Sequence, residues 1–202
     1  MWHFLMKNKM KGENRVVQKR LKPALGQLRD RHRLVGAEIG VAYGTHASYY
    51  LKELDIECVF LIDPYIEYEN YTCQAGKLKE SLEAVEKIAH TKLCGYEQKI
   101  KWIKKKSAEA SQLIADDSLD FVYIDGNHSY DSVVEDISLY YSKLKKGGLF
   151  SGHDYDWEGV KRAVDEFVKT CNLDLYIETT GEVRGRDTYD WWIWKKEKGK
   201  YE

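Results

Sequence analysis

LDFVYIDGNHSYDSVVEDISLYYSKLKKGGLFSGHDY, residues Leu119–Tyr155, is the stretch around which the chain is organised. Its first apolar run, Phe121–Ile124, is short and bounded by turn-forming residues, which predicts a buried strand that ends at Asp125. Apolar residues then recur at helical spacing, so a helix is expected to run through Lys146 and to stop at the two glycines that follow. With a second strand at Leu149–Ser151, the stretch is predicted to form one strand–helix–strand unit with a parallel crossover.

Ionisable residues follow both predicted strands directly. Asp125 and His128 come after the first strand, and His153 and Asp154 come after the second. Because parallel strands end at the same edge of a sheet, these four side chains are expected to gather there. Open α/β sheets bind their ligands at that edge. The sequence therefore predicts the functional site at the carboxyl edge of this unit.

A glycine-containing loop follows another predicted strand, at Leu34–Val41. The pattern consists of Glu38, Gly40 and Gly44, and a helix is expected to begin soon afterwards. Glycines in such a loop permit positive φ and a close approach of a ligand to the backbone, and the helix start offers unpaired N–H groups. Tight turns also need glycine for steric reasons. The loop alone therefore predicts either a binding loop or simple architecture.

An acid after the next predicted strand favours a binding loop. Strand Cys58–Ile62 leads into Asp63, roughly 20 residues after the glycine loop, where a carboxylate holds the ribose diol in nucleoside-binding α/β sheets. The alternative for Asp63 is an ordinary turn acid before Pro64. The combination of loop and acid predicts a nucleoside site.

The other elements follow from periodicity and complete an α/β fold. We expect a doubly wound, seven-stranded, mostly parallel sheet in which a short turn reverses the C-terminal strand. Ser107 is expected to cap the helix that follows it. Helices are expected at His46–Leu54, Gly76–Lys92, Ser107–Ile114 and Trp157–Thr170, and further strands at Ile100–Ile103, Leu173–Thr179 and Tyr189–Trp194.

Charge divides the chain into two parts. Residues 1–33 contain ten Lys or Arg and two acids, a charge of +8, which leaves −9 for residues 34–202 because the whole chain carries −1. Residues 1–33 are predicted to form a basic helical extension, and residues 34–202 the domain. A basic arm could touch nucleic acid or an anionic surface. Apolar residues near helical spacing favour packing on its own domain or on a second subunit of a homo-oligomer, although Pro23 would interrupt such a helix.

The remaining composition bears on compartment and partners. No apolar run approaches the length of a membrane span, and the N-terminus lacks the sustained apolar core of a secretory signal. The four cysteines show neither CxxC pairing nor histidines at zinc-finger spacing. We expect a cytoplasmic protein with no membrane partner. Nucleic acid is a disfavoured partner because the body is acidic.

The order of these elements resembles that of the class I S-adenosylmethionine-dependent methyltransferases over about Leu34 to Trp194. More narrowly, IDGNHSY at 124–130 and GHDY at 152–155, with Asp136 and Gly147-Gly148 between them, are similar to the small family related to macrocin O-methyltransferase. The resemblance implies transfer of a methyl group from S-adenosylmethionine to an oxygen of a small, polyhydroxylated, sugar-like acceptor.

The resemblance also implies cofactor contacts, residue by residue. The glycine loop and the acid before it would shape the pocket for the methionine moiety. Asp63 would hold the ribose hydroxyls, and Ser107 would lie near the adenine. The cofactor-binding residues implied in this way are Glu38, Gly40, Gly44, Asp63, Ser107 and Asp125.

In the metal-dependent sugar O-methyltransferases that this family resembles, the positions of Asp125, His153 and Asp154 bind a divalent ion, and the resemblance implies Mg²⁺ or Mn²⁺ for this chain. An imidazole at His153 would favour Mn²⁺, Fe²⁺ or Zn²⁺ over Mg²⁺, or would leave His153 without a bond to the metal. Such an ion would hold two acceptor oxygens and lower the pKa of the hydroxyl to be methylated. Those relatives carry an acid, which the resemblance suggests is the base, at the position of Asn127. An asparagine cannot take a proton. Histidine is the residue type best suited to take a proton near neutral pH, so His128 is predicted to be the catalytic base, next to Asp125.

A second departure from the relatives is Lys104–Lys106, where they usually carry an acid that could bond the adenine amino group. Three readings stay open. The first is a metal-dependent methyltransferase. The second is a methyltransferase without a metal, in which His128 or His153 is a simple general base. The third is a binding module that keeps the fold without catalysis. Cofactor titration and sensitivity to a chelator separate them.

Overall fold

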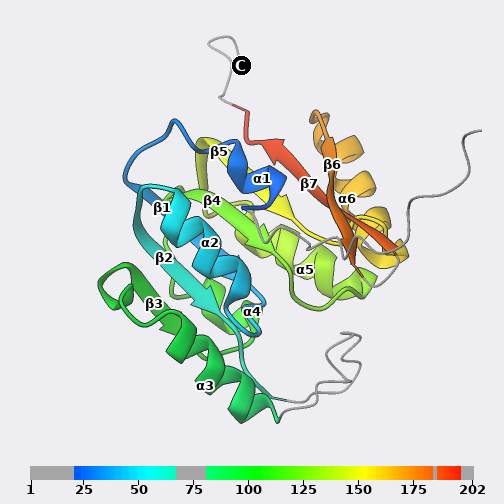
Figure 1. Cartoon of the computed structure of the whole chain (residues 1–202). Helices are drawn as coiled ribbons and strands as arrows, with labels where there is room; N and C mark the ends of the chain where they lie inside the picture. Colours follow the sequence, from blue (N-terminus) through cyan, green and yellow to red (C-terminus); the bar gives the residue numbers. More distant parts are fainter. Residues whose placement is uncertain (1–20, 67–80, 184–185, 197–202) are drawn as a thin grey trace, which may run out of the picture.

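The computed structural model of the protein describes residues 21–66, 81–183 and 186–196. It shows a seven-stranded sheet with helices on both faces (Figure 1). The strand order is β3-β2-β1-β4-β5-β7-β6, and β7 runs antiparallel to both neighbours while the other pairs are parallel. This confirms the predicted fold class. The strands are β1 Leu34–Ile39, β2 Ile56–Ile62, β3 Ile100–Ile103, β4 Leu119–Ile124, β5 Leu144–Gly152, β6 Tyr176–Val183 and β7 Arg186–Trp194.

Two hydrophobic clusters, one on each side of the sheet, hold the helices in place. The first and second α-helices contribute to one cluster, and the last three contribute to the other. The third helix packs in a smaller cluster with Tyr65, and Leu93 just after it joins the first cluster. Strand β4 supplies residues to both, which explains its continuous apolar run. The helices are α1 Pro23–Gly26, α2 Thr45–Glu53, α3 Leu82–Lys92, α4 Ser107–Ser111, α5 Tyr130–Tyr140 and α6 Glu158–Cys171, and a 3₁₀ turn at Glu97–Lys99 precedes β3.

The loops after β1 and β4 touch at Gly40. This glycine has a φ of 86°, and a Cβ added there would lie 2.1 Å from the carbonyl oxygen of Asp125. Its N–H donates to Ile62 O at 2.9 Å. Only glycine has both the conformational freedom and the small size that this crossing requires. The contact fixes the glycine loop against the residue that ends β4.

Helix α5 ends earlier than the sequence predicts. It stops at Tyr140, and β5 already begins at Leu144, which is fully buried and pairs with Leu119 of β4. Lys145, expected at the helix end, instead bonds both oxygens of Asp120 at 2.9 Å. Burial of a leucine in the sheet and this ion pair outweigh the local helix-end pattern.

Other boundaries also differ from the predicted ones. Ser107 is the first residue of α4 and does not cap it; the cap residue is Lys106, without a side-chain bond. The Ser107 side chain acts on the carboxyl of Asp136 instead, where it opposes the rise in the pKa of that acid. Helix α3 begins at Leu82, and the preceding part of the helix expected from Gly76 lies outside the described residues. The two last strands extend further into their connection than predicted.

The described part of the N-terminal extension packs on the domain. Leu21, Leu25 and Leu28 belong to the same hydrophobic cluster as β1 and α2. Pro23 occupies the first turn of α1, where its missing N–H removes no helical hydrogen bond. Figure 1 shows α1 next to β5 and β7. The predicted extension before residue 21 lies outside the described residues.

Within the described residues, no helix combines the length and apolar character that crossing a membrane requires.

Candidate active site

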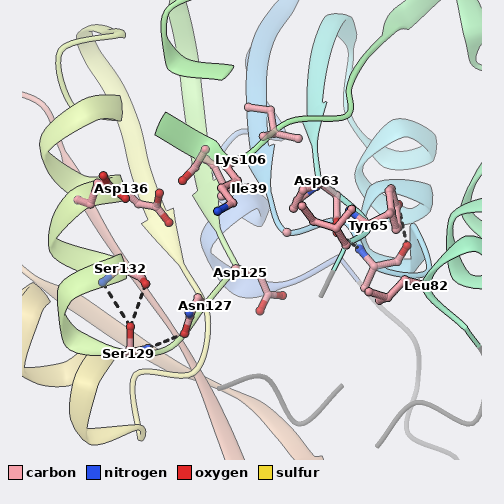
Figure 2. A pocket seen from close by; sticks show the side chains of 18 of the residues that line it. Ile39, Asp63, Tyr65, Leu82, Lys106, Asp125, Asn127, Ser129, Ser132 and Asp136 are labelled. Carbon is pink, nitrogen blue, oxygen red and sulfur yellow. Dashed lines mark hydrogen bonds between the residues drawn. The ribbon is translucent and has the colours of Figure 1, made fainter. Parts of the chain in front are cut away.

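A pocket of about 510 Å³ opens at the carboxyl ends of β1, β2 and β4 (Figure 2). Gly40, Asp63 and Tyr65 line one side of it, after β1 and β2. Ser107, from the start of α4, and Asp125, from the end of β4, also line it. We call this the main pocket. Four of the predicted cofactor residues, Gly40, Asp63, Ser107 and Asp125, therefore surround one cavity.

Asp63 holds the glycine loop through backbone amides. Its Oδ2 accepts hydrogen bonds from the N–H groups of Val41 at 3.0 Å and Ala42 at 2.9 Å, and its Oδ1 accepts from Tyr65 N at 2.9 Å. Burial raises the pKa of Asp63, although the amide donors oppose the shift. The Tyr65 hydroxyl donates to Ala42 O at 2.9 Å and completes the support. The acid after β2 thus shapes the loop after β1 and borders the pocket.

Glu38 and Gly44 do not line the main pocket. Glu38 is 1% exposed; its Oε1 lies 3.1 Å from His46 Nδ1, and its Oε2 accepts from the Tyr50 hydroxyl at 2.7 Å. Gly44 is the residue before α2 and has a φ of 65°. Glu38, the acid of the glycine pattern, is therefore buried away from the main pocket. Its contacts with two side chains of α2 hold that helix in position.

Three side chains converge beside the main pocket at the ends of β4 and β5. His128 Nε2 lies 2.9 Å from Asp154 Oδ2 and 3.9 Å from Asp125 Oδ1. One ligand atom from each of these residues lies within 4.8 Å of the other two, an arrangement that could hold a metal ion. We call these three residues the edge group. Asp125 belongs to it and also lines the main pocket.

His153, which the sequence predicts as a metal ligand, lies outside the edge group. Its Nδ1 is 3.2 Å from Asp190 Oδ1, which also accepts from the Tyr123 hydroxyl at 2.6 Å. Burial and the nearby charge of Lys22 act to lower the pKa of His153, but three carboxylates outweigh them and raise it. Strand β5 ends at Gly152 and Asp154 has a φ of 53°, so the chain turns here and His153 and Asp154 face different partners. The structure assembles His128 with the two aspartates instead.

Lys22 is a charged residue of this edge that the sequence did not indicate. Its Nζ donates to Asp125 Oδ2 at 3.0 Å and lies 4.9 Å from the centre of the Tyr123 ring. Burial acts to raise the pKa of Asp125, but the charges of Lys22 and two histidines hold it well below its usual value. Nothing in the sequence distinguishes Lys22 from the other basic residues of the arm, because its partner is 103 positions away.

The comparisons with known proteins agree with this geometry. The family described as "Methyltransferase domain" matches residues 37–155, more than half of the chain. The chain belongs to this family of S-adenosylmethionine-dependent methyltransferases. The match begins in β1 and includes the end of β4 and the GHDY motif. It therefore covers the main pocket's glycine loop and all three residues of the edge group.

One curated relative and several solved structures resemble this methyltransferase. An uncharacterized protein of Acanthamoeba polyphaga mimivirus is 30% identical over 160 residues, which cover 75% of this chain and 67% of the relative. A putative O-methyltransferase from Klebsiella pneumoniae superposes with a TM-score of 0.65 at 14% identity, covering 86% of this chain and 78% of that one. At this level of identity the likeness shows the fold alone.

Two further structures share that fold. The O-methyltransferase TomG from Streptomyces achromogenes, solved in complex with S-adenosylmethionine, superposes with a TM-score of 0.63 at 13% identity, over 84% of this chain and 76% of that one. An rRNA methylase from Streptococcus thermophilus superposes with a TM-score of 0.62 at 12% identity, over 86% and 92%. Methyltransferases with different acceptors therefore share this fold.

Asp136 of α5 is an unusual residue in the wall of the methyltransferase's main pocket. It is 3% exposed, and its Oδ1 has no hydrogen-bond partner among the described residues. Burial raises its pKa to about 7, while the bond from Ser107 opposes the shift and Glu135 adds to it. Figure 2 shows Asp136 on the helix that forms the wall opposite Asp63. A carboxyl group at this place is partly protonated near neutral pH.

Proposed function

We propose that the protein transfers the methyl group of S-adenosylmethionine to an oxygen of a small, polyhydroxylated, sugar-like acceptor. The observation that carries the proposal is the position of Asp125, which borders the main pocket and also belongs to the edge group. A cofactor in the pocket and an acceptor at the edge group would therefore be neighbours. In-line transfer needs this proximity of donor and acceptor.

On the cofactor side, Asp63 is the proposed contact for the ribose hydroxyls. Its oxygens accept three backbone bonds, and a carboxylate has about four acceptor sites, so capacity for a hydroxyl remains. Gly40 brings its backbone to the pocket without a side chain. Ser107 also lines the pocket and is the proposed neighbour of the adenine. Glu38 would not touch the cofactor, and its role would be to position α2.

On the acceptor side, the edge group suits a divalent ion. Its two carboxylates and one imidazole are a donor set that Mn²⁺, Fe²⁺ or Zn²⁺ accept more readily than Mg²⁺. Both ring nitrogens of His128 are buried, and neither makes a hydrogen bond of good geometry to a described residue, although Nε2 is close to Asp154. Asp125 Oδ1 faces His128, and Oδ2 is bound by Lys22. A bound ion would orient acceptor oxygens and acidify the hydroxyl to be methylated.

A second candidate mechanism uses no metal. The ammonium of Lys22 already neutralises Asp125, which favours this reading. His128 would then take the proton of the acceptor hydroxyl through Nδ1, while Asp154, 2.9 Å from Nε2, would stabilise the imidazolium that forms. Asn127 has a structural role in either mechanism, since its Oδ1 accepts from Ser129 N at 3.0 Å before α5.

The experiment that tests the proposal starts with the cofactor. S-Adenosylhomocysteine is titrated into the wild type and into Asp63→Ala by calorimetry. We expect micromolar binding that the substitution weakens at least about tenfold, since it removes a ribose partner and the acceptor of three backbone amides that shape the glycine loop. Absence of binding to the wild type would refute the proposed function and leave the non-catalytic reading.

Transfer to acceptors is then measured with radiolabelled S-adenosylmethionine and a panel of sugars and sugar nucleotides. Each reaction is run with a chelator and with Mn²⁺ or Mg²⁺ restored. Activity that a chelator abolishes and Mn²⁺ restores supports the metal mechanism. Activity unaffected by chelator supports the histidine mechanism. Methylation of RNA in place of the sugars would contradict the acceptor class.

A further inference from the structure

Lys22 lies at the edge group although it belongs to the N-terminal segment. Its ammonium contacts Asp125 Oδ2 at 3.0 Å and the face of Tyr123 at 4.9 Å, and its side chain is 19% exposed. A carboxylate and an aromatic face together hold a cation more strongly than either does alone. Lys22 therefore places a fixed positive charge next to a predicted metal ligand.

The backbone that carries Lys22 is anchored independently of this ion pair. Ala24 N donates to the buried Asp190 Oδ2 at 3.1 Å, and Leu25 is fully buried in the first hydrophobic cluster. The segment therefore stays in place if the ammonium leaves Asp125. A lysine side chain has four rotatable bonds, so it can turn toward solvent while α1 remains docked.

Negative charge accumulates at the edge group, and the ammonium of Lys22 offsets part of it. Asp125 and Asp154 both approach His128, and Asp190 is close by through His153. Carboxylates gathered in a partly buried site attract a cation. A divalent ion in the edge group and the ammonium of Lys22 would share the carboxylate of Asp125. Two cations that share one carboxylate repel each other, and this repulsion is strong where water is scarce.

We propose that Lys22 is a built-in competitor of the divalent ion at the edge group. While the ammonium holds Asp125, affinity for the ion is low, and ion binding requires the ammonium to turn away. The inference rests on the proposed function, because it assigns control of the same acceptor site. By thermodynamic linkage, whatever strengthens the Lys22–Asp125 contact weakens metal binding by the same factor.

The test is a titration of Mn²⁺ into the full-length protein, followed by the electron paramagnetic resonance signal of the free ion and by calorimetry. The wild type is compared with Lys22→Gln, which keeps a donor for Asp125 without the charge, and with Lys22→Met, which removes both. We expect both variants to bind Mn²⁺ at least about tenfold more tightly than the wild type. Lys22→Arg retains the charge and is expected to bind within about threefold of the wild type.

Two controls locate the effect. Lys145 forms an ion pair of similar length with Asp120, outside the edge group, so Lys145→Gln is expected to leave Mn²⁺ affinity at the wild-type value. Adding His128→Gln to Lys22→Gln is expected to remove the gain, because it deletes a ligand of the edge group. Thermal unfolding of every variant identifies any that does not fold, and Lys22→Gln keeps the test valid if Lys22→Met fails.

The possible results separate the inference from the proposed function. Equal Mn²⁺ affinity in wild type and Lys22→Gln, no Mn²⁺ binding to any variant, or a gain that survives His128→Gln would each overturn the competitor role. S-Adenosylhomocysteine is titrated into the same samples. If it binds while the Mn²⁺ result is negative, the competitor role falls and the proposed function stands. If it does not bind to the wild type, the proposed function falls as well.

Discussion

The main pocket and the edge group meet at Asp125, yet different kinds of interaction build them. On the pocket side, the carboxylate of Asp63 is held by three backbone amides that lie within 22 positions of it. At the edge group, Asp125 is held by the side chain of Lys22, and His128 lies 3.9 Å from its other oxygen. The first arrangement depends on backbone geometry after two strands. The second depends on side chains that only the complete fold brings together.

This comparison suggests that the two regions respond differently to substitution. Backbone amides cannot be removed by a side-chain change, and they carry no net charge. Side-chain ion pairs can be removed one partner at a time, which leaves a buried charge behind. Damage to the edge group should therefore affect catalysis and metal binding, while damage to the glycine loop should affect cofactor binding and stability.

The largest effect is expected where the two regions touch. Gly40→Ala adds a Cβ that would lie 2.1 Å from the Asp125 carbonyl, at a φ of 86°. We expect it to lower the free energy of unfolding by about 3 kcal/mol or more, since both steric overlap and backbone strain oppose it. Chemical denaturation measures the change. The matched control is Gly147→Ala, which has a φ of 69° and no atom within 4 Å, and should cost only about 1 kcal/mol of strain. Equal losses would mean that the crossing at Gly40 is not tight.

The second-largest effect is expected at the edge group, and it tests whether methyl transfer and cofactor binding depend on separate regions. Asp154→Asn removes the carboxylate 2.9 Å from His128 and outside the main pocket's lining. We expect methyl transfer to fall at least about a hundredfold, because either mechanism needs this charge, as a metal ligand or as the partner of the imidazolium. Affinity for S-adenosylhomocysteine should stay within about threefold. A parallel loss of cofactor binding would show that the two regions are one cooperative unit.

The smallest effect concerns the buried acid of the pocket wall. The pKa of Asp136 is about 7 in the folded protein and near the ordinary 3.8 when unfolded. Between these values the folded protein retains a proton that the unfolded chain has lost, so the Asp136 contribution to stability falls as pH rises from about 4 to 7 and is constant above. The stability of Asp136→Asn relative to the wild type should therefore improve by at least about 1 kcal/mol between pH 5 and pH 8. Unfolding curves at both pH values measure this. A difference that does not change with pH would place an ordinary pKa at Asp136.

The comparison of the two regions also describes how far sequence reasoning reached. The strand that leads into Asp63, the glycine at the tight crossing and the gathering of four ionisable residues at one edge, Asp125, His128, His153 and Asp154, were predicted from local patterns. The structure brings three of the four together, while His153 faces Asp190. The predicted end of α5 was wrong because burial of Leu144 in β5 outweighs the local preference of the lysines and glycines for a helix end. The predicted cap role of Ser107 was wrong because α4 begins at Ser107 itself, so that Lys106 occupies the cap position.

The sequence by itself determined the order of strands and helices along the chain. The period of apolar residues is a local property, and burial of the apolar face stabilises the matching element in any fold. It also determined that ionisable residues follow β4 and β5. Only the tertiary structure decided that His128 joins the two aspartates, that His153 faces Asp190 and that Lys22 reaches Asp125. These choices depend on side-chain directions and on charges from distant segments. Electrostatic attraction acts through space, so no spacing along the chain records it.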